Sequence, residues 1–377
     1  MAEGYAGSGV DVDVESRAAI ILFDAAKKTF QNRKENIGEI IIPFDDFSGV
    51  RAIDVGNLPE GSMMGMGFDG VGTKVEIAQR MDMHETIAFD LLAMVCDDAV
   101  LRGAEPVLVG SILDVNSLGT DDTRLSIVEQ LAKGYVEAAE AANVAIINGE
   151  IAQLSHVVGG YGDGLTYNWG SALIWFADKT KMFTGKEIEL GDAIVVLEEK
   201  GFRSNGLSLV RKILGEYLGD DWHNEGFKGQ KLGLQVLTPS TIYSKVFVHM
   251  HGGFQTEGTC KIHGAVHITG GGIREKVGRV LRPSGYGAVL NDLFEPCDVM
   301  KYCQELGGVS DEEAYRVWNM GQGFAIITPE PEKVIEECSK FGIKAKVAGK
   351  IIEDKEIKIK SKGLFKTGDF LVFKTER

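Results

Sequence analysis

The sequence predicts an α/β (α+β) fold that is divided into two domains. Segments with helical periodicity alternate along the chain with short apolar runs of the strand type, a pattern typical of domains that combine helices with sheets. The length of 377 residues is sufficient for two domains of ordinary size. A polar segment at residues 178–189 separates two predicted strands. We therefore expect one domain at residues 1–178 and another at residues 179–377.

The individual elements follow from local spacing. Helices are predicted where apolar residues recur at intervals of three and four, because this spacing gives a helix one apolar face. They cover residues 15–30, 87–102, 122–142, 206–217, 239–250, 297–306 and 331–340. Strands are predicted where short apolar runs are bounded by turn residues. They cover residues 62–68, 107–115, 144–148, 171–177, 193–198, 287–290, 323–328 and 346–352. The basic tail at residues 355–377 is strand-like in places.

Charge and cysteine content narrow the class of partner. The net charge of −15 argues against a general nucleic-acid or membrane-surface binder but is compatible with a small phosphorylated ligand. Five cysteines, none in a C-x-x-C pair, indicate a reduced, cytoplasmic protein without a disulfide framework or a zinc site. We expect no secretory signal and no membrane span, because the N-terminal segment is acidic and no uncharged apolar run approaches ~20 residues.

A glycine-rich segment, GFDGVGTK at residues 67–74, is the first candidate site. Its glycines allow backbone N–H groups to approach a phosphate, Asp69 could hold a cation, and Lys74 could neutralise an anion. The segment reads G-T-K where a P-loop requires G-K-[ST], so we exclude a P-loop. The alternative interpretation is a plain corner between a strand and a helix.

Three acidic residues interrupt an otherwise nearly apolar helix in the segment FDLLAMVCDDAVLRG, namely Asp90, Asp97 and Asp98. A helix this apolar is expected to be buried, where each unpaired carboxylate would cost several kcal/mol. A bound divalent cation would offset this cost. Alternatively, the acids line a solvated edge or pair with Arg80 or Arg102.

Two further segments place polar residues next to predicted elements. In INGEIAQ, a short strand delivers Asn148, Gly149 and Glu150 into a turn, where Glu150 could join a metal site or could simply be solvated. In GFRSNGLSLVRK, Ser204 or Asn205 could cap a helix whose free N–H groups would suit an anion. An ordinary helix start is the simpler interpretation of that segment.

The segment HITGGG at residues 267–272 predicts a second anion-binding loop at a helix start. Three consecutive glycines are costly in conformational entropy, so we expect them to serve a purpose. His267 precedes the loop, although a lone histidine is more often structural. NMGQGF at residues 319–324 is another glycine turn, without clear chemistry of its own.

Taken in order, these segments resemble the aminoimidazole ribonucleotide synthetase family. The matching segments are GYAGSGVDVD, FDGVGTK, FDLLAMVCDDAVLRGAEP, NGEIAQ, SNGLSLVRKIL, LTPSTIY, HITGGG and NMGQGF, spread over residues 4–324. The resemblance implies dimers whose N-terminal sheets meet in a barrel, with a mixed-sheet C-terminal domain. It also implies an enzyme that uses ATP and Mg²⁺ to convert formylglycinamidine ribonucleotide to aminoimidazole ribonucleotide.

Carried over residue by residue, the resemblance implies where each ligand binds. The nucleotide would be held by Asp69, Gly70, Gly72, Thr73, Lys74 and Asp98. Mg²⁺ would be held by Asp69, Asp98 and Glu150. The substrate would be held by His267, Thr269, Gly270, Gly271 and Gly272. Asn205, Arg203 and Lys74 would act at the reacting centre.

The chain departs from the family pattern at several of these positions. Arg203 stands where the family has a His, and Asp97 stands where it has an Asn. The glycine-rich loop near residue 40 is reduced to Gly38, and the residues after Glu150 also differ. Two alternatives therefore remain open. One is ATP chemistry on another acceptor, as in hydrogenase maturation proteins, selenophosphate synthetases and thiamine monophosphate kinases. The other is a non-catalytic nucleotide-binding paralogue.

Overall fold

The computed structural model describes residues 12–42, 49–119 and 122–375, and these residues form two compact units. The first unit takes the described residues through Cys96 together with Pro106–Phe176, and the second takes Asp97–Glu105 and the described residues from Ala177 onward. The last segment of the first unit ends at Phe176, close to the domain boundary expected after residue 178. Local spacing gave no indication that Asp97–Glu105 belongs with the second unit. Most of the segment GYAGSGVDVD lies outside the described residues, as does the end of the segment that follows Gly38.

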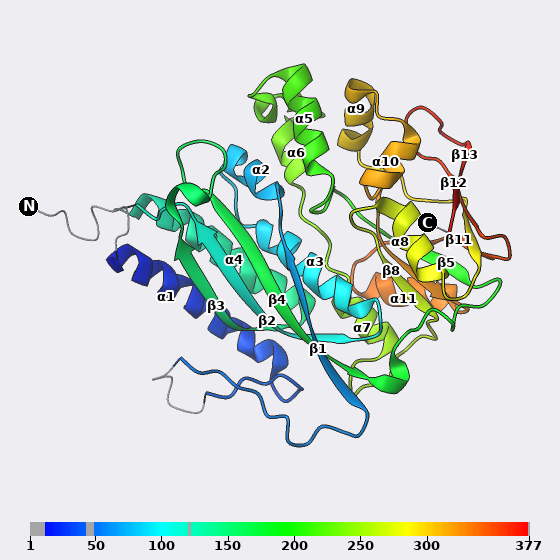
Figure 1. Cartoon of the computed structure of the whole chain (residues 1–377), viewed down its shortest axis with the longest axis horizontal. Coiled ribbons are helices and arrows are strands. Elements are labelled where there is room, and N and C mark those ends of the chain that lie inside the picture. Colours follow the sequence, from blue (N-terminus) through cyan, green and yellow to red (C-terminus); the bar gives the residue numbers. More distant parts are fainter. Residues whose placement is uncertain (1–11, 43–48, 120–121, 376–377) are drawn as a thin grey trace, which may run out of the picture. The chain divides into compact units, whose positions relative to one another are not determined.

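The first unit is built on a four-stranded sheet with the order β1-β4-β2-β3. Its strands are β1 (Ser62–Gly70), β2 (Glu105–Val115), β3 (Ala145–Gln153) and β4 (Tyr167–Asp178). Its helices are α1 (Val12–Thr29), α2 (Lys74–Met81), most of α3 (Ile87–Val100) and α4 (Leu125–Ala142). Strands β2 and β3 are parallel, and α4 provides the crossover that such a pair requires. Helix α1 packs against α4 and β3, as Figure 1 shows.

The second unit is built on a seven-stranded mixed sheet with the order β13-β12-β9-β11-β5-β10-β8. Its strands are β5 (Ala193–Glu198), β8 (Gly264–His267), β9 (Gly287–Leu290), β10 (Gln322–Thr328), β11 (Ala345–Ile352), β12 (Glu356–Lys360) and β13 (Phe370–Lys374). A separate hairpin pairs β6 (Gly226–Phe227) with β7 (Gln230–Lys231). The pairing of β12 with β9 is parallel, and the other described pairings in this sheet are antiparallel.

The helices of the second unit are α5 (Leu207–Leu218), α6 (Leu232–Leu237), α7 (Ser244–His251), α8 (Gly272–Leu281), α9 (Asp298–Gly307), α10 (Asp311–Val317) and α11 (Pro331–Lys340). Of these, α8 and α11 contact strands of the large sheet. Strand residues such as Leu197 and Ile326 meet Phe247 of α7 and Val334 of α11 in one buried apolar cluster. Among the described residues, none of the helices combines the length and apolarity needed to cross a bilayer.

The mixed α/β class is confirmed, and the longer predicted elements are present. The spacing missed α2, α6, α10 and the short strand β8. The turn predicted at Asn148–Gly149–Glu150 is wrong, because these residues lie inside β3. There they pair in parallel with Gly110, Ser111 and Ile112 of β2. The backbone pairing of the two strands thus extends over residues whose side chains are polar. The helix predicted at residues 239–250 begins only at Ser244.

Candidate functional site

Two buried acids of α3 pair with cations that lie far from them in sequence. Asp90 accepts a hydrogen bond from Lys74 Nζ through Oδ1 at 2.7 Å, and both side chains are fully buried within the first unit. The cation that the structure places on Asp90 is thus Lys74, whereas the sequence suggested Arg80 or Arg102. Arg80 pairs with Glu76 of its own helix, and Arg102 donates to the carbonyl of Phe183. Lys74 therefore has an anionic partner without a phosphate, and its role towards a nucleotide stays a prediction.

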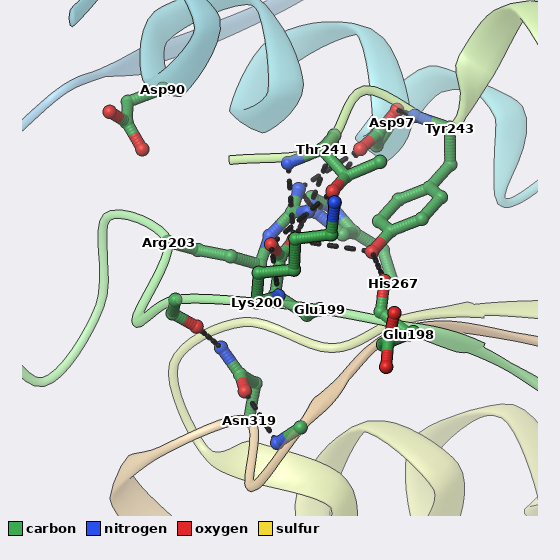
Figure 2. Close-up of polar contacts among 12 residues, drawn as sticks. Asp90, Asp97, Glu198, Glu199, Lys200, Arg203, Thr241, Tyr243, His267 and Asn319 are labelled. Carbon is green, nitrogen blue, oxygen red and sulfur yellow. Dashed lines mark hydrogen bonds and ion pairs between the residues drawn. The ribbon is translucent and has the colours of Figure 1, made fainter. Parts of the chain in front are cut away.

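Arg203 is the centre of a buried ion-pair cluster in the second unit (Figure 2). Its Nη1 donates to Glu199 Oε2 and to the carbonyl of Thr241, each at 2.8 Å. Its Nη2 donates to Asp97 Oδ2 at 2.9 Å and to His267 Nε2 at 2.8 Å. Burial opposes the charge, but the two carboxylates hold the pKa of Arg203 above its ordinary value. Both Nη atoms are thus engaged by protein groups.

The other oxygen of Asp97 binds the start of a helix. Asp97 Oδ1 accepts the backbone N–H groups of Tyr243 and Ser244 at 2.9 and 2.8 Å, and α7 begins at Ser244. A helix leaves its first N–H groups without intrahelical partners, so a carboxylate is a favourable cap there. Burial raises the pKa of Asp97 to about 7, opposed by Arg203 and these two N–H groups.

The backbone around Arg203 is held from a second loop. Arg203 has a φ of +59°, which is unusual for a residue with a side chain. The Asn319 side chain donates to the carbonyl of Gly201 at 2.8 Å and accepts the N–H of Gly321 at 2.8 Å (Figure 2). The glycine turn NMGQGF, for which the sequence indicated no chemistry, therefore braces the Arg203 loop.

His267 connects this cluster to an exposed carboxylate. Its Nδ1 lies 2.7 Å from Asp98 Oδ1. Burial lowers the pKa of His267 to about 4, so the ring is neutral at pH 7 and has one donor and one acceptor nitrogen. Arg203 can only donate to Nε2, so the proton must lie on Nδ1 and be donated to Asp98.

Asp98 is the outward end of this chain of hydrogen bonds, with its side chain 54% exposed. Desolvation opposes its ionisation. The hydrogen bond from His267 and the charges of Lys276 and Arg279 nevertheless keep the pKa of Asp98 below its usual range. An ionised, outward-facing carboxylate held by a buried histidine is suited to a hard cation such as Mg²⁺.

The loop of HITGGG lies between β8 and α8, beside Asn205. Gly271 and Gly272 have φ angles of +94° and +61°. A Cβ at Gly272 would lie 2.1 Å from the carbonyl oxygen of Tyr315, so only glycine fits there. A Cβ at Gly270 would lie 3.2 Å from Asn205 Oδ1, which places that side chain against the loop. The second unit thus brings together Arg203, Asn205, His267, Thr269, the three glycines and Asp98.

The remaining candidates lie in the first unit. Asp69, Gly70 and Glu150 line one groove on the sheet, and Asp114 also contributes to it. Asp69 accepts the N–H of Gly70 at 2.7 Å. Gly72, with a φ of +70°, and Thr73 form the exposed turn before α2. Carboxylate oxygens on an open groove fit the ligand preference of Mg²⁺.

Sequence reasoning missed several members of the cluster, among them Glu199, Thr241, Tyr243, Lys276 and Arg279. Glu199 directly follows a predicted strand, a position where ligand-binding residues gather, and this signal could have identified it. The backbone groups of Thr241 and Tyr243 carry no signal in the sequence.

Comparison with known proteins gives two family matches. Residues 50–171 match the model of the AIR synthase related protein N-terminal domain, and residues 189–362 match that of the C-terminal domain. A phosphoribosylformylglycinamidine cyclo-ligase of Pyrococcus horikoshii is 31% identical over 96% of this chain and 98% of its own length. That of Methanocaldococcus jannaschii is 31% identical over 97% of both chains.

Solved structures share the fold at low sequence identity. A thiamine-monophosphate kinase from Stenotrophomonas maltophilia superposes with a TM-score of 0.60 at 14% identity, covering 93% of this chain and 97% of its own. The hydrogenase maturation protein HypE of E. coli gives a TM-score of 0.57 at 15% identity, covering 92% and 95%. Likeness at this level of identity concerns the fold alone.

Proposed function

The chain belongs to the AIR synthase related protein family, and we propose that it is an ATP-dependent phosphoribosylformylglycinamidine cyclo-ligase of purine biosynthesis. The observation that carries the proposal is the similarity to relatives of that name, 31–33% identical over most of their length. The gathering of Asp98, His267, Asn205 and the glycine loop in the second unit supports it.

In the proposed reaction, the amide oxygen of formylglycinamidine ribonucleotide accepts the γ-phosphoryl group of ATP. The neighbouring amidine nitrogen then attacks the activated carbon, the ring closes and phosphate leaves. The contribution of the protein is positioning and charge neutralisation, which suits a site without an obvious nucleophile. The HITGGG loop and the Asn205 side chain would hold the phosphorylated substrate.

Mg²⁺ would supply charge neutralisation on the phosphates. Candidate oxygen ligands for it are Asp69 and Glu150 of the first-unit groove and, separately, Asp98 of the second unit. A solved thiamine monophosphate kinase structure of the same fold contains AMPPCP, which supports nucleotide use in this fold. A contact of Lys74 with the nucleotide stays a prediction, because its buried charge is already matched by Asp90.

Arg203 is assigned a positioning role in place of direct contact with a phosphate. Its guanidinium is 1% exposed, and both Nη atoms are engaged. Through His267 it fixes which imidazole nitrogen carries the proton, and so it orients Asp98. This role differs from the one that the resemblance implies, in which Arg203 acts at the reacting centre.

We also propose a homodimer formed through the first unit, in the cytoplasm. Along β1, Met64, Met66 and Phe68 alternate outward and are 59%, 53% and 73% exposed. Ile112 of β2 lies on the same groove as Phe68 and is also exposed. An apolar sheet face of this kind favours burial against a second copy.

The test is turnover of the full chain. Purified protein is incubated with ATP, Mg²⁺ and formylglycinamidine ribonucleotide, and aminoimidazole ribonucleotide and phosphate are measured together. Equal formation of both products is expected. Thiamine monophosphate in place of the ribonucleotide tests the alternative acceptor. Phosphorylation of that compound alone, or nucleotide binding without turnover of either, would reject the cyclo-ligase assignment.

A further inference from the structure

A cavity in the second unit is lined largely by cationic side chains. It lies between α8, α10 and β13, and its volume of about 620 Å³ is within the range of small-molecule sites. Its cations are Arg274, Arg279, Arg282, Arg316 and Lys374. The lining contains a single acid, Glu275. Such an excess of positive charge at one place is unexpected in a chain whose net charge is −15.

The arginines that α8 contributes to this cavity are not neutralised by acids. In the part of the chain that the structure describes, Arg274, Arg279 and Arg282 form no ion pair. Glu275 is four positions before Arg279, a spacing that favours an ion pair on a helix. Its carboxylate instead turns back to the start of α8, where a Cβ at Gly271 would clash with Glu275 Oε2. The three positive charges are therefore available to an anion from solution.

Contacts with the end of the chain hold two of these arginines at the cavity. Arg282 donates through Nε to the carbonyl of Thr375, at a distance of 3.4 Å. The guanidinium carbon of Arg274 lies 5.1 Å from the centre of the Phe373 ring on β13. Neither contact uses the Nη atoms. Guanidinium groups bind phosphate oxygens through paired N–H donors, so two arginines held in this way are suited to a phosphorylated ligand.

The cavity lies on a different face of α8 from the one next to Asp98. Arg274 and Arg282 are eight positions apart and so lie on one side of the helix. Lys276, whose charge helps to lower the pKa of Asp98, is two positions from Arg274 and therefore about 200° round the helix. Arg279 also acts on Asp98 and borders both regions. Arg274 and Arg282 thus belong to the cavity alone.

The spread of the cations restricts the ligand. Arg274 and Arg282 are separated by ~12 Å along the helix axis, which is a long row for one phosphate group to neutralise. Two linked phosphate groups distribute their charge along such a row. A nucleic acid is disfavoured by the net negative charge of the chain.

We propose that this cavity binds the diphosphate group of a small molecule. The inference does not rest on the proposed function, because neither Arg274 nor Arg282 is assigned there to the substrate, the nucleotide or Mg²⁺.

The experiment is calorimetric titration of the full chain with pyrophosphate, and with sulfate for comparison, at fixed ionic strength. EDTA in the buffer removes divalent cations, so that binding through metal-bound carboxylates does not contribute. Arg274→Gln, Arg282→Gln and the double variant remove charge from the cavity, whereas Arg274→Lys keeps it. Lys212→Gln is the matched control, since Lys212 is an exposed cation on α5 of the same unit. Thermal unfolding establishes that each variant is folded.

We expect pyrophosphate to bind the parent more tightly than sulfate does. Each Gln variant should weaken pyrophosphate by about tenfold, as the loss of a charge-assisted hydrogen bond does, and the double variant should weaken it further. Arg274→Lys should lose less affinity than Arg274→Gln, and Lys212→Gln should bind as the parent does. ADP in the same buffer separates two sources of the diphosphate. ADP binding that is weakened in the double variant identifies an organic diphosphate, and binding of pyrophosphate alone identifies the inorganic ion.

Three results would overturn the proposal. They are absence of pyrophosphate binding by the parent, equal affinity for pyrophosphate and sulfate, and equal pyrophosphate binding by the parent and the folded double variant. Binding of a single-stranded oligonucleotide in place of pyrophosphate would likewise reject a small-molecule site. Because the titration is made without Mg²⁺ and without turnover, a failure of the cyclo-ligase assay leaves its result interpretable.

Discussion

Arg203 Nη2 lies 2.9 Å from Asp97 Oδ2, so two of the positions at which the resemblance implies a departure from the family pattern are in direct contact. Each residue by itself would place a charge in a buried environment. Together they form an ion pair whose remaining atoms bind Glu199, His267 and the start of α7. The two departures are therefore best treated as one structural feature.

Arg203→Ala is expected to destabilise the protein by about 3–5 kcal/mol, because it leaves Asp97 and Glu199 buried without their cation. Asp97→Asn in the Arg203→Ala background should cost less than in the parent. Urea unfolding of the four proteins measures this coupling. Lys212→Ala removes an exposed cation on α5 and should change stability by less than ~0.5 kcal/mol. Strictly additive effects of the two cluster substitutions would contradict a shared ion pair.

His267 variants test the assigned tautomer. The side-chain amide of Asn can place a donor near the position of Nδ1, so His267→Asn should preserve the bond to Asp98 better than His267→Gln. We expect Mg²⁺–ATP affinity to fall less in the Asn variant than in the Gln variant. Nitrogen NMR of the parent should show His267 protonated on Nδ1 at pH 7. A proton on Nε2 would reject the arrangement.

Asp98→Asn is expected to weaken binding of ATP in the presence of Mg²⁺ by ~2–4 kcal/mol, because a ligand of the cation is lost. Calorimetry with Mg²⁺ and with EDTA measures the effect. Asp292→Asn serves as the matched control, since Asp292 is an exposed acid paired with Lys346 in the same unit. Equal ATP affinity with and without Mg²⁺ would contradict the assignment of Asp98 as a Mg²⁺ ligand.

Phe68→Glu is expected to convert the proposed homodimer to a monomer. A charge on the exposed apolar face of β1 would have to be desolvated when a second copy packs against it. Sedimentation equilibrium over a range of concentrations measures the change. Phe365→Glu, at a residue 55% exposed in the second unit, should leave the mass unchanged. A parent protein that is monomeric at every concentration would refute the dimer.

Stability should fall as the pH is lowered from about 6.5 to about 4, partly through His84. Burial lowers the pKa of His84 to about 4, against the opposing charge of Asp82. Between these values the unfolded chain binds a proton that the folded chain excludes, so His84 destabilises the fold as acidity rises. His84→Asn should reduce this loss by roughly 2–3 kcal/mol at pH 4, as measured by urea unfolding. The control is His156→Asn at an exposed histidine, which should leave the pH dependence of the unfolding free energy unaltered. If the unfolding free energy changes with pH equally in both variants, His84 is not a cause of the acid destabilisation.

Local patterns were sufficient for much of the fold and for part of the site. Helix α4 has a strong three- and four-residue periodicity and was predicted closely, whereas the eight-residue α2 carries too few repeats of the pattern. The glycine loop before α8 was recognised because its composition is unusual wherever it occurs. The predicted strand at residues 144–148 is shorter than β3, because the polar residues that follow it lack a strand-like pattern. Backbone pairing with β2 nevertheless keeps them in the strand.

The sequence by itself determined the alternation of helices and strands, the burial of α3 and the segments that identify the family. Only the tertiary structure decided which groups neutralise the acids of α3. Lys74 is separated from Asp90 by 16 positions, and Arg203 from Asp97 by 106 positions. Periodicity reports which face of an element is buried, because burial depends on neighbours a few residues away. The partner of a buried charge depends on which distant segments pack against that face, and this follows from the packing of the whole unit.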